Sequence, residues 1–122
     1  MATRYNIKPE IVTVLKEIEG LKKIRSTIPA EWKEFPCAIY STKAKAANQD
    51  LSMEETFTKW TVSIDVYDNR NPVTNLAEEV IKRMNKLGFK NEEAGDNNVT
   101  GLFRVQLKFT GTVNNKTLLV TH

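Results

Sequence analysis

The segment Thr58–Asp68, with the sequence T-K-W-T-V-S-I-D-V-Y-D, decides the fold. Apolar side chains occupy every second position from Trp60 to Val66, and polar side chains fill the positions between them. Because successive side chains of a β-strand point to opposite faces, this alternation predicts a strand with one apolar and one polar face. The abundance of β-branched and aromatic residues also suits a pleated, half-buried surface.

A second strand and a helix complete the predicted centre. Phe103–Thr110 repeats the alternation, so two strands share one polar face in a mainly antiparallel sheet. Between them, Val73–Leu87 carries apolar residues at the i, i+3, i+4, i+7 spacing of an amphipathic helix, which we expect to cover the apolar face. The residues that we expect to be buried together are Trp60, Ile64, Val80, Met84, Val105 and Leu107.

The remaining elements are shorter. An amphipathic helix is expected from Pro9 to a stop at Gly20. The segment Leu21–Ile28 fits either an extension of that helix or an edge strand, and Cys37–Tyr40 is expected to be a short strand beside the central pair. The whole chain, 1–122, is therefore predicted to be a single α+β domain. Its architecture is a mainly antiparallel sheet of about four strands, with two helices packed on one face.

Local residues indicate where the elements begin and end. Asn71 is expected to cap the long helix, with Pro72 at its first position. Gly88 is expected to end that helix in a left-handed conformation. Asn114-Asn115 fits a two-residue hairpin turn that returns 117–120 as a short final strand.

Two polar segments are the candidate docking loops. Thr42–Thr56 fits either a long loop or a hairpin arm with Asn48-Gln49-Asp50 at its tip, and Asn91–Gly101 fits a loop. Within them, Asn48–Glu55 and Glu92–Thr100 are expected to be the most mobile segments of the isolated protein, because they have few apolar anchors. The candidate docking residues in these segments are Asn48, Asp50, Glu54, Glu92, Asp96 and Asn98.

The composition argues against a disulfide, a histidine-dependent nucleophile and a metal site. The chain has 122 residues, a net charge of +3, 40% hydrophobic and 27% charged residues, as is ordinary for a globular domain. Cys37 and His122 are the only cysteine and histidine, and the histidine is terminal, where chains usually fray. We therefore expect no disulfide, no Ser-His or Cys-His nucleophile and no metal site.

Other functional signals are also absent from the sequence. It contains neither a G-x-x-x-x-G-K-[ST] nor a G-x-G-x-x-G motif. No apolar run reaches the ~20 residues of a membrane-spanning helix. The start of the chain, M-A-T-R-Y-N-I-K-P-E, lacks the apolar region of a signal peptide. The prediction is a cytoplasmic protein that is not an enzyme and has no cofactor.

The polar face of the sheet supplies the candidate interaction site. Asp65 and Tyr67 are its most notable exposed pair, although ordinary cross-strand contacts would account for them equally well. The residues that we assign to a lumen, subunit or partner face are Lys59, Asp65, Tyr67, Arg104 and Lys108.

Four segments together resemble one protein family. They are F-P-C-A-I-Y at Phe35–Tyr40, W-T-V-S-I-D-V-Y-D ending at Asp68, L-A-E-E-V-I-K-R-M-N-K-L-G-F at Leu76–Phe89, and the closing L-F-R-V-Q-L-K-F-T-G-T-V. In this order, after an N-terminal helix, they resemble the tail terminator or tail completion (head-to-tail joining) proteins of long-tailed bacteriophages and prophages. The resemblance extends over nearly the whole chain, and its motifs are structural.

The resemblance implies a structural protein of the virion. Such proteins assemble as rings, commonly hexamers, at the head-proximal end of the tail tube, where they stop tube polymerisation and join the capsid connector. The implied partners are further copies of the chain, the tail tube protein and head-tail connector proteins, with DNA only as passing cargo and no membrane. The implied location is the host bacterial cytoplasm during assembly and then the virion tail. No catalytic residue comes with the family.

Three other hypotheses remain open at this point. The chain could be a neighbouring head-tail connector component. It could be a small α+β nucleic-acid-binding domain that uses Lys59, Arg104 and Lys108, although few aromatic residues accompany these cations. It could also be a hydrolase or transferase subunit with carboxylate chemistry at Glu54-Glu55 or Glu92-Glu93, for which the histidine and glycine motifs are missing.

Overall fold

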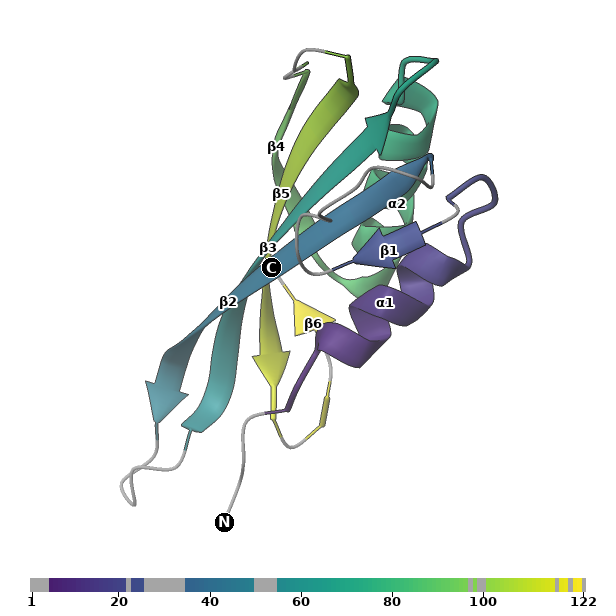
Figure 1. Cartoon of the computed structure of the whole chain (residues 1–122). Coiled ribbons are helices and arrows are strands. Elements are labelled where there is room, and N and C mark those ends of the chain that lie inside the picture. The colour runs from purple at the N-terminus through teal and green to yellow at the C-terminus, as the bar shows by residue number, and fades with distance from the viewer. Residues whose placement is uncertain are drawn as a thin grey trace.

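The computed structural model describes residues 5–21, 23–25, 35–49, 55–96, 98, 101–115, 117–118 and 120–121. These residues form two helices and six strands, so the α+β class is confirmed while the expected four strands are too few (Figure 1). In chain order the elements are α1 Lys8–Lys16, β1 Lys23–Arg25, β2 Cys37–Gln49, β3 Glu55–Asp68, α2 Thr74–Leu87, β4 Lys90–Asp96, β5 Phe103–Asn114 and β6 Val120–Thr121.

One sheet organises the molecule. Its strands lie in the order β1-β2-β3-β5-β4, and β6 pairs with β5 beyond the end of β4. Only the β1–β2 pair is parallel; the other pairs are antiparallel. The two strands with the strongest sequence pattern, β3 and β5, are neighbours at the centre, with Ile64 opposite Leu107 and Val66 opposite Val105.

The segment Thr42–Thr56 is a hairpin arm and not a loop over its described residues. β2 continues to Gln49 and β3 begins at Glu55, with pairing from Cys37↔Tyr67 out to Gln49↔Glu55. Figure 1 shows this arm extending past the body of the domain. Asp50, at the expected tip, and the candidate docking residue Glu54 lie outside the described residues.

The prediction of a loop at Asn91–Gly101 is wrong for the first half of that segment. Asn91–Asp96 belongs to β4, which pairs with β5 from Lys90↔Thr110 to Asp96↔Val105. Six of the seven β4 residues are exposed, so the strand needs no apolar alternation and its sequence shows none. Backbone pairing with β5 holds it in the sheet. β1 is the edge-strand alternative for 21–28; it pairs with β2 through three residues, and its Ile24 packs against the core.

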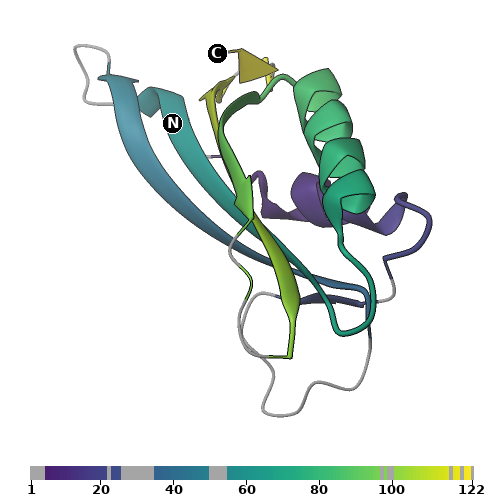
Figure 2. The ribbon, with the colours of Figure 1, turned by 90° about the horizontal axis from the view of Figure 1, so that it is seen from above.

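Both helices lie on one face of the sheet, as expected (Figure 2). The six residues predicted to be buried together are at most 7% exposed and belong to one core. α1 adds Ile11 and Leu15 to this core, the flanking residues Ile7 and Ile18 also belong to it, and Phe89 after α2 is fully buried.

The sequence predicted the C-terminal end of α2 correctly but not its N-terminal end. Gly88 ends the helix with φ of +114°, as predicted, and a Cβ there would lie 2.4 Å from the carbonyl oxygen of Val120. The expected start is wrong: Val73 is the N-cap residue and the helix begins at Thr74, without a side-chain cap. Val73 is buried in the core, so packing rather than capping fixes this end.

The C-terminal hairpin also differs from the expected two-residue turn. β5 ends at Asn114 and β6 begins at Val120, opposite Val113, so more than two residues separate the strands. Asn115 has another role within this connection. Its side-chain amide donates to Thr58 Oγ1 at 3.0 Å, and its Oδ1 accepts the backbone N–H of Tyr5 at 3.1 Å. Asn115 thereby joins the chain before α1 to the central strand.

Candidate functional site

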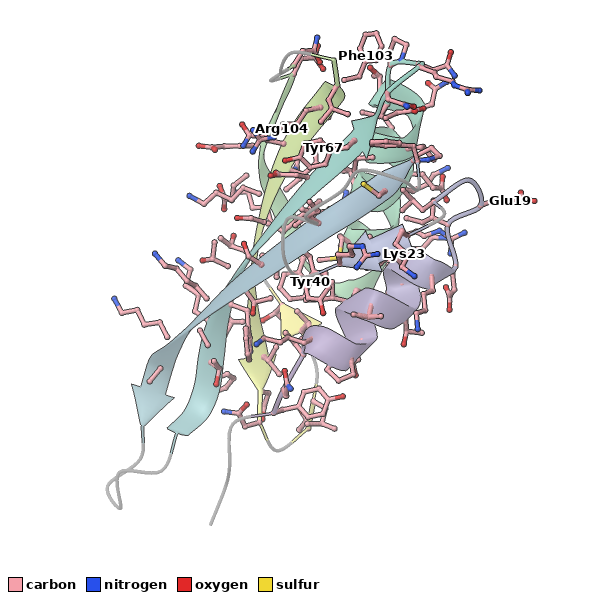
Figure 3. The ribbon with its side chains drawn as sticks, in the orientation of Figure 1. Glu19, Lys23, Tyr40, Tyr67, Phe103 and Arg104 are labelled. Carbon is pink, nitrogen blue, oxygen red and sulfur yellow. The ribbon has the colours of Figure 1, made fainter. Side chains whose placement is uncertain are left out.

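The side of the sheet opposite the helices, which we call the polar face, carries all five residues predicted from the sequence. Lys59, Asp65 and Tyr67 alternate along β3 and share one side, and the register places Arg104 opposite Tyr67 and Lys108 opposite Ser63 on β5. Figure 3 shows Tyr67 and Arg104 projecting from the side of the sheet away from the helices. The strand alternation therefore brought the five residues to one surface, but they form two separate groups.

The first group is a packed cluster of Asp65, Tyr67 and Arg104. Arg104 Nη2 lies 2.9 Å from Asp65 Oδ2, and each of the two side chains is 21% exposed. The guanidinium carbon of Arg104 lies 5.4 Å from the centre of the Tyr67 ring. One cation thus makes an ion pair and a cation–π contact, the latter contributing about 0.5–2 kcal/mol depending on desolvation.

The expectation that Tyr67 is exposed is wrong. Its side chain is only 4% exposed, with Cys37 opposite it on β2 and Arg104 opposite it on β5. Burial raises the pKa of the Tyr67 hydroxyl above its ordinary value, and the nearby Asp65 carboxylate raises it further. Tyr67 is therefore not available as a stacking platform for a base, and this end of the polar face stabilises the fold.

The second group is an open set of lysines. Lys59 and Lys108 are exposed, and so are Lys43 and Lys45 on β2, which lie opposite Thr61 and Lys59. Lys43 and Lys45 were not among the residues predicted for this face, because the expected strand was Cys37–Tyr40 and a hairpin arm was only one of two alternatives for Thr42–Thr56. The alternation K-A-K-A at 43–46 was the available signal, since Ala44 packs against the core while the lysines face solvent.

Glu92 joins this lysine group from β4. Its Oε1 accepts a hydrogen bond of 2.8 Å from Thr110 Oγ1 on the polar face. That hydrogen bond lowers the pKa of the Glu92 carboxyl, with further lowering from Lys90, Lys59 and Lys108. Glu92, predicted as a loop residue, therefore belongs to the polar face, where it partly neutralises the lysines around it.

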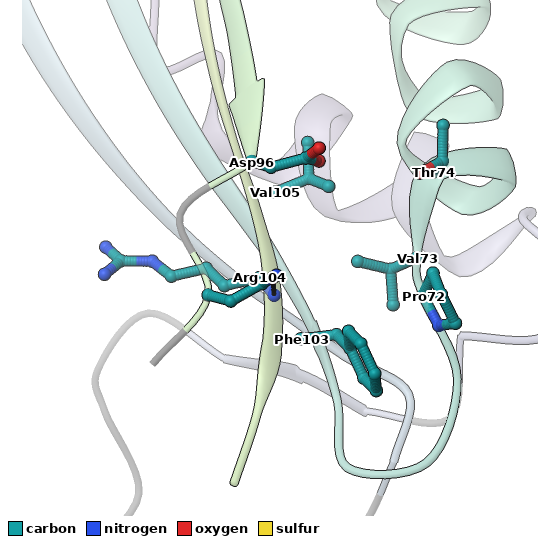
Figure 4. A pocket seen from close by; sticks show the side chains of 8 residues that line it. Pro72, Val73, Thr74, Asp96, Phe103, Arg104 and Val105 are labelled. Atoms are coloured by element: carbon teal, nitrogen blue, oxygen red, sulfur yellow. Dashed lines mark hydrogen bonds between the residues drawn. The ribbon is translucent and has the colours of Figure 1, made fainter. Parts of the chain in front are cut away.

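The other docking residues lie elsewhere. Asn98 Oδ1 accepts the backbone N–H of Arg104 at 3.0 Å, so its side chain is held against β5. Asp96 ends β4 and lines a pocket of about 190 Å³ beside the start of α2, with Pro72, Thr74 and Phe103 (Figure 4). Asn48 lies in β2, and only its backbone is described.

The described residues give little support for catalytic or metal chemistry. Burial raises the pKa of the Cys37 thiol to about 11, which keeps it protonated and unreactive near neutral pH. No group of three or more His, Cys, Asp or Glu side chains that could hold a metal ion occurs in the described ranges. His122 lies outside them. The two described helices are too short and too polar to cross a membrane.

The described residues of this face form a broad charged surface. Lysines from β2, β3 and β5 lie on one face, and the partly buried Asp65–Arg104 pair anchors one end of that face. A scan of the chain against protein-family models and a search of curated proteins both found no match.

Proposed function

We propose that this protein is a structural subunit of a phage or prophage tail, which caps the tail tube as a ring and takes part in head-to-tail joining. The observation that carries the proposal is the one-sided sheet: both helices cover one face, while the opposite face carries mainly polar side chains from β2, β3, β5 and β4. A ring supplies such a face with a lumen or a subunit boundary. The four sequence segments that resemble tail terminator and completion proteins support the same function.

The open lysine group makes a role for this face in assembly testable. Lys59 and Lys108 are exposed and belong to different strands, so reversing their charge changes the surface without removing a buried contact. Asp65 and Arg104 are unsuitable for this purpose, because breaking their partly buried pair would also weaken the fold. The informative variant is therefore K59E/K108E, with K16E/K82E on the two helices as a control of equal charge change.

The test uses the phage or prophage that carries this gene. Disrupting the gene should leave heads and tails unjoined, with tails of uncontrolled length in electron micrographs. Supplying the parent protein or K16E/K82E should restore joined particles, whereas K59E/K108E should not. Normal tail length and infectivity without the gene would contradict the proposed function. Full rescue by K59E/K108E would show that Lys59 and Lys108 are not needed for the proposed function.

A nucleic-acid-binding domain is the second candidate, and one observation favours it. Lys43, Lys45, Lys59 and Lys108 gather on one face, where they could contact phosphates. Glu92 lies among these cations, and Tyr67 is buried, so the face lacks the stacking aromatics that single-strand binding uses. Affinity for duplex or single-stranded DNA that falls steeply with salt would favour this candidate over the structural one.

A further inference from the structure

Among the described strands, two edges of the sheet have no partner strand, and they lie on opposite sides of it. β1 pairs with β2 only along Cys37–Ile39, so the outer edge of β2 at 40–46 has no partner strand within the described ranges. β4 pairs with β5 on one side, and no described strand pairs with its other side. An unpaired edge presents backbone N–H and C=O groups that can pair with another strand.

The two edges carry opposite charges on the same face. The β2 edge, 40–46, carries Lys43 and Lys45, both exposed, and no acidic residue. On β4, Glu93 pairs with Lys108 and Glu92 bonds Thr110, so both carboxylates lie on the polar face together with the two β2 lysines. We call 40–46 the basic edge and β4 the acidic edge; Lys90 is the one cation of β4.

These charges distinguish between the ways in which two copies could meet. Two basic edges would bring lysines of both copies together, and two acidic edges would bring carboxylates together; like charges directly opposite each other destabilise a strand pair. The unlike edges place Lys43 and Lys45 beside Glu92 and Glu93, a combination that gives both attraction and specificity, whereas two acidic edges would have only Lys90 of each copy to offset their carboxylates. The charge pattern therefore favours a head-to-tail contact over a two-fold symmetric one.

The strand directions are compatible with such a contact. Three antiparallel steps separate β2 from β4, so these two strands run in opposite directions within one copy. A rotation about an axis roughly parallel to the strands keeps their directions and keeps the polar face on the same side. The basic edge of one copy then meets the acidic edge of the next as an antiparallel pair, and repeated rotation closes a ring.

We infer that the basic edge of each copy pairs with the acidic edge of a second copy, placing Lys43 and Lys45 beside Glu92 and Glu93 of that copy. The inference rests on the proposed ring and names the surfaces that close it. The register shift between Asn91 and Glu93 leaves Glu93–Asp96 as the regular part of the acidic edge. A bulge of this kind and edge lysines both discourage indiscriminate edge pairing, so the charge match selects the partner.

Disulfide trapping tests the contact directly. Within one copy, β2 and β4 are separated by β3 and β5, about 14 Å at the usual strand spacing, whereas a disulfide needs Cα atoms within roughly 7 Å. A bond between positions 43 and 93 must therefore join two copies. Cys37 is buried and its thiol pKa is raised to about 11, so it should contribute little background.

The experiment mixes K43C and E93C proteins under mild oxidation at the highest concentration that stays in solution. We expect the mixed K43C–E93C dimer to exceed both same-variant dimers several-fold, as measured by mass spectrometry. Mixed K16C and K82C proteins, with cysteines on the helices, should show no such excess. A mixed dimer no more abundant than the roughly twofold statistical excess over each same-variant dimer, or no dimer above the helix control, would overturn the inference.

A charge exchange tests the same contact without new bonds. K43E/K45E makes both edges acidic, and E92K/E93K makes both edges basic. Each variant alone should associate more weakly than the parent in sedimentation velocity at low salt, while an equimolar mixture should recover association. A mixture no better than either variant alone would overturn the edge contact. That outcome is distinguishable from failure of the proposed function, which is measured by tail length and particle joining in phage lacking the gene.

Discussion

Arg104 on β5 lies between two residues of β3, with its guanidinium 2.9 Å from the Asp65 carboxylate and 5.4 Å from the centre of the Tyr67 ring. All three side chains project from the polar face, yet none of them is freely exposed: Asp65 and Arg104 are 21% exposed and Tyr67 is 4% exposed. The polar face therefore has a packed end that stabilises the sheet and an open lysine end that is free to contact a partner.

Removing the Asp65 carboxylate should destabilise the fold more than removing an exposed charge. Asp65→Ala leaves the partly buried Arg104 without its ion-pair partner, which we expect to cost about 1–3 kcal/mol of unfolding free energy. Lys59→Ala, on the same strand and face, should change it by less than about 0.5 kcal/mol. Urea unfolding measures both values; equal midpoints for the two variants would show that the cluster contributes nothing.

The strand register predicts which face of β3 tolerates truncation. Ile64 is fully buried against the helices, so Ile64→Ala should cost ~2–5 kcal/mol. The neighbouring Ser63 points to the polar face, and Ser63→Ala should leave stability nearly unchanged. Chemical denaturation of the two variants measures the difference, and a similar loss at both positions would contradict the register.

Gly88 should be intolerant of any side chain. Its φ is +114°, and an added Cβ would lie 2.4 Å from the carbonyl oxygen of Val120, so Gly88→Ala should cost about 1–3 kcal/mol through backbone strain alone. Gly95 on the acidic edge is a matched control, because no atom lies within 4 Å of an added Cβ there. Thermal unfolding should show a lower midpoint for Gly88→Ala only; an equal midpoint shift in Gly95→Ala would contradict this account.

The Cys37 thiol should titrate at alkaline pH. Burial raises its pKa from 9.0 to about 11, which means that the folded state favours the protonated thiol. Because a raised pKa disfavours ionisation in the fold, the stability linked to Cys37 is fully present below pH 9 and is lost as pH rises towards 11.

Two measurements check this titration. Reaction with a thiol reagent at pH 8 should be slow in the native protein and fast in denaturant. Cys37→Ala should remove the part of the alkaline loss of stability that belongs to this thiol. Rapid labelling of the native protein at pH 8 would show that the thiol is accessible and not held protonated by burial.

The parts of the fold that sequence predicted are those where burial imposes a period. β3 and β5 alternate because one of their faces is buried by the helices, and α2 repeats at helical spacing because Ala77, Val80 and Met84 pack on the sheet. β4 could not be found in this way. It is exposed along nearly its whole length, so its sequence K-N-E-E-A-G-D lacks the apolar alternation that would identify a strand.

For the candidate site, the sequence predicted the face of each side chain but not its exposure. Strand alternation placed Lys59, Asp65, Tyr67, Arg104 and Lys108 on one face, because a side chain's face depends only on its position in the strand. It could not give their exposure, which depends on neighbours from other strands: Arg104 over Tyr67 is a contact between β5 and β3. Lys43 and Lys45 were missed because the apolar run of β2 ends at Tyr40. The strand continues past that residue only because its backbone pairs with β3.

The most direct test of the central claim is complementation of phage that lack this gene with the charge-exchanged proteins. We predict that K43E/K45E alone and E92K/E93K alone each fail to give joined particles, and that supplying both together restores joining and uniform tail length. Rescue by both together requires that unlike edges of different copies meet in the assembled tail. Full rescue by either variant alone, or normal tails in phage without the gene, would contradict the account.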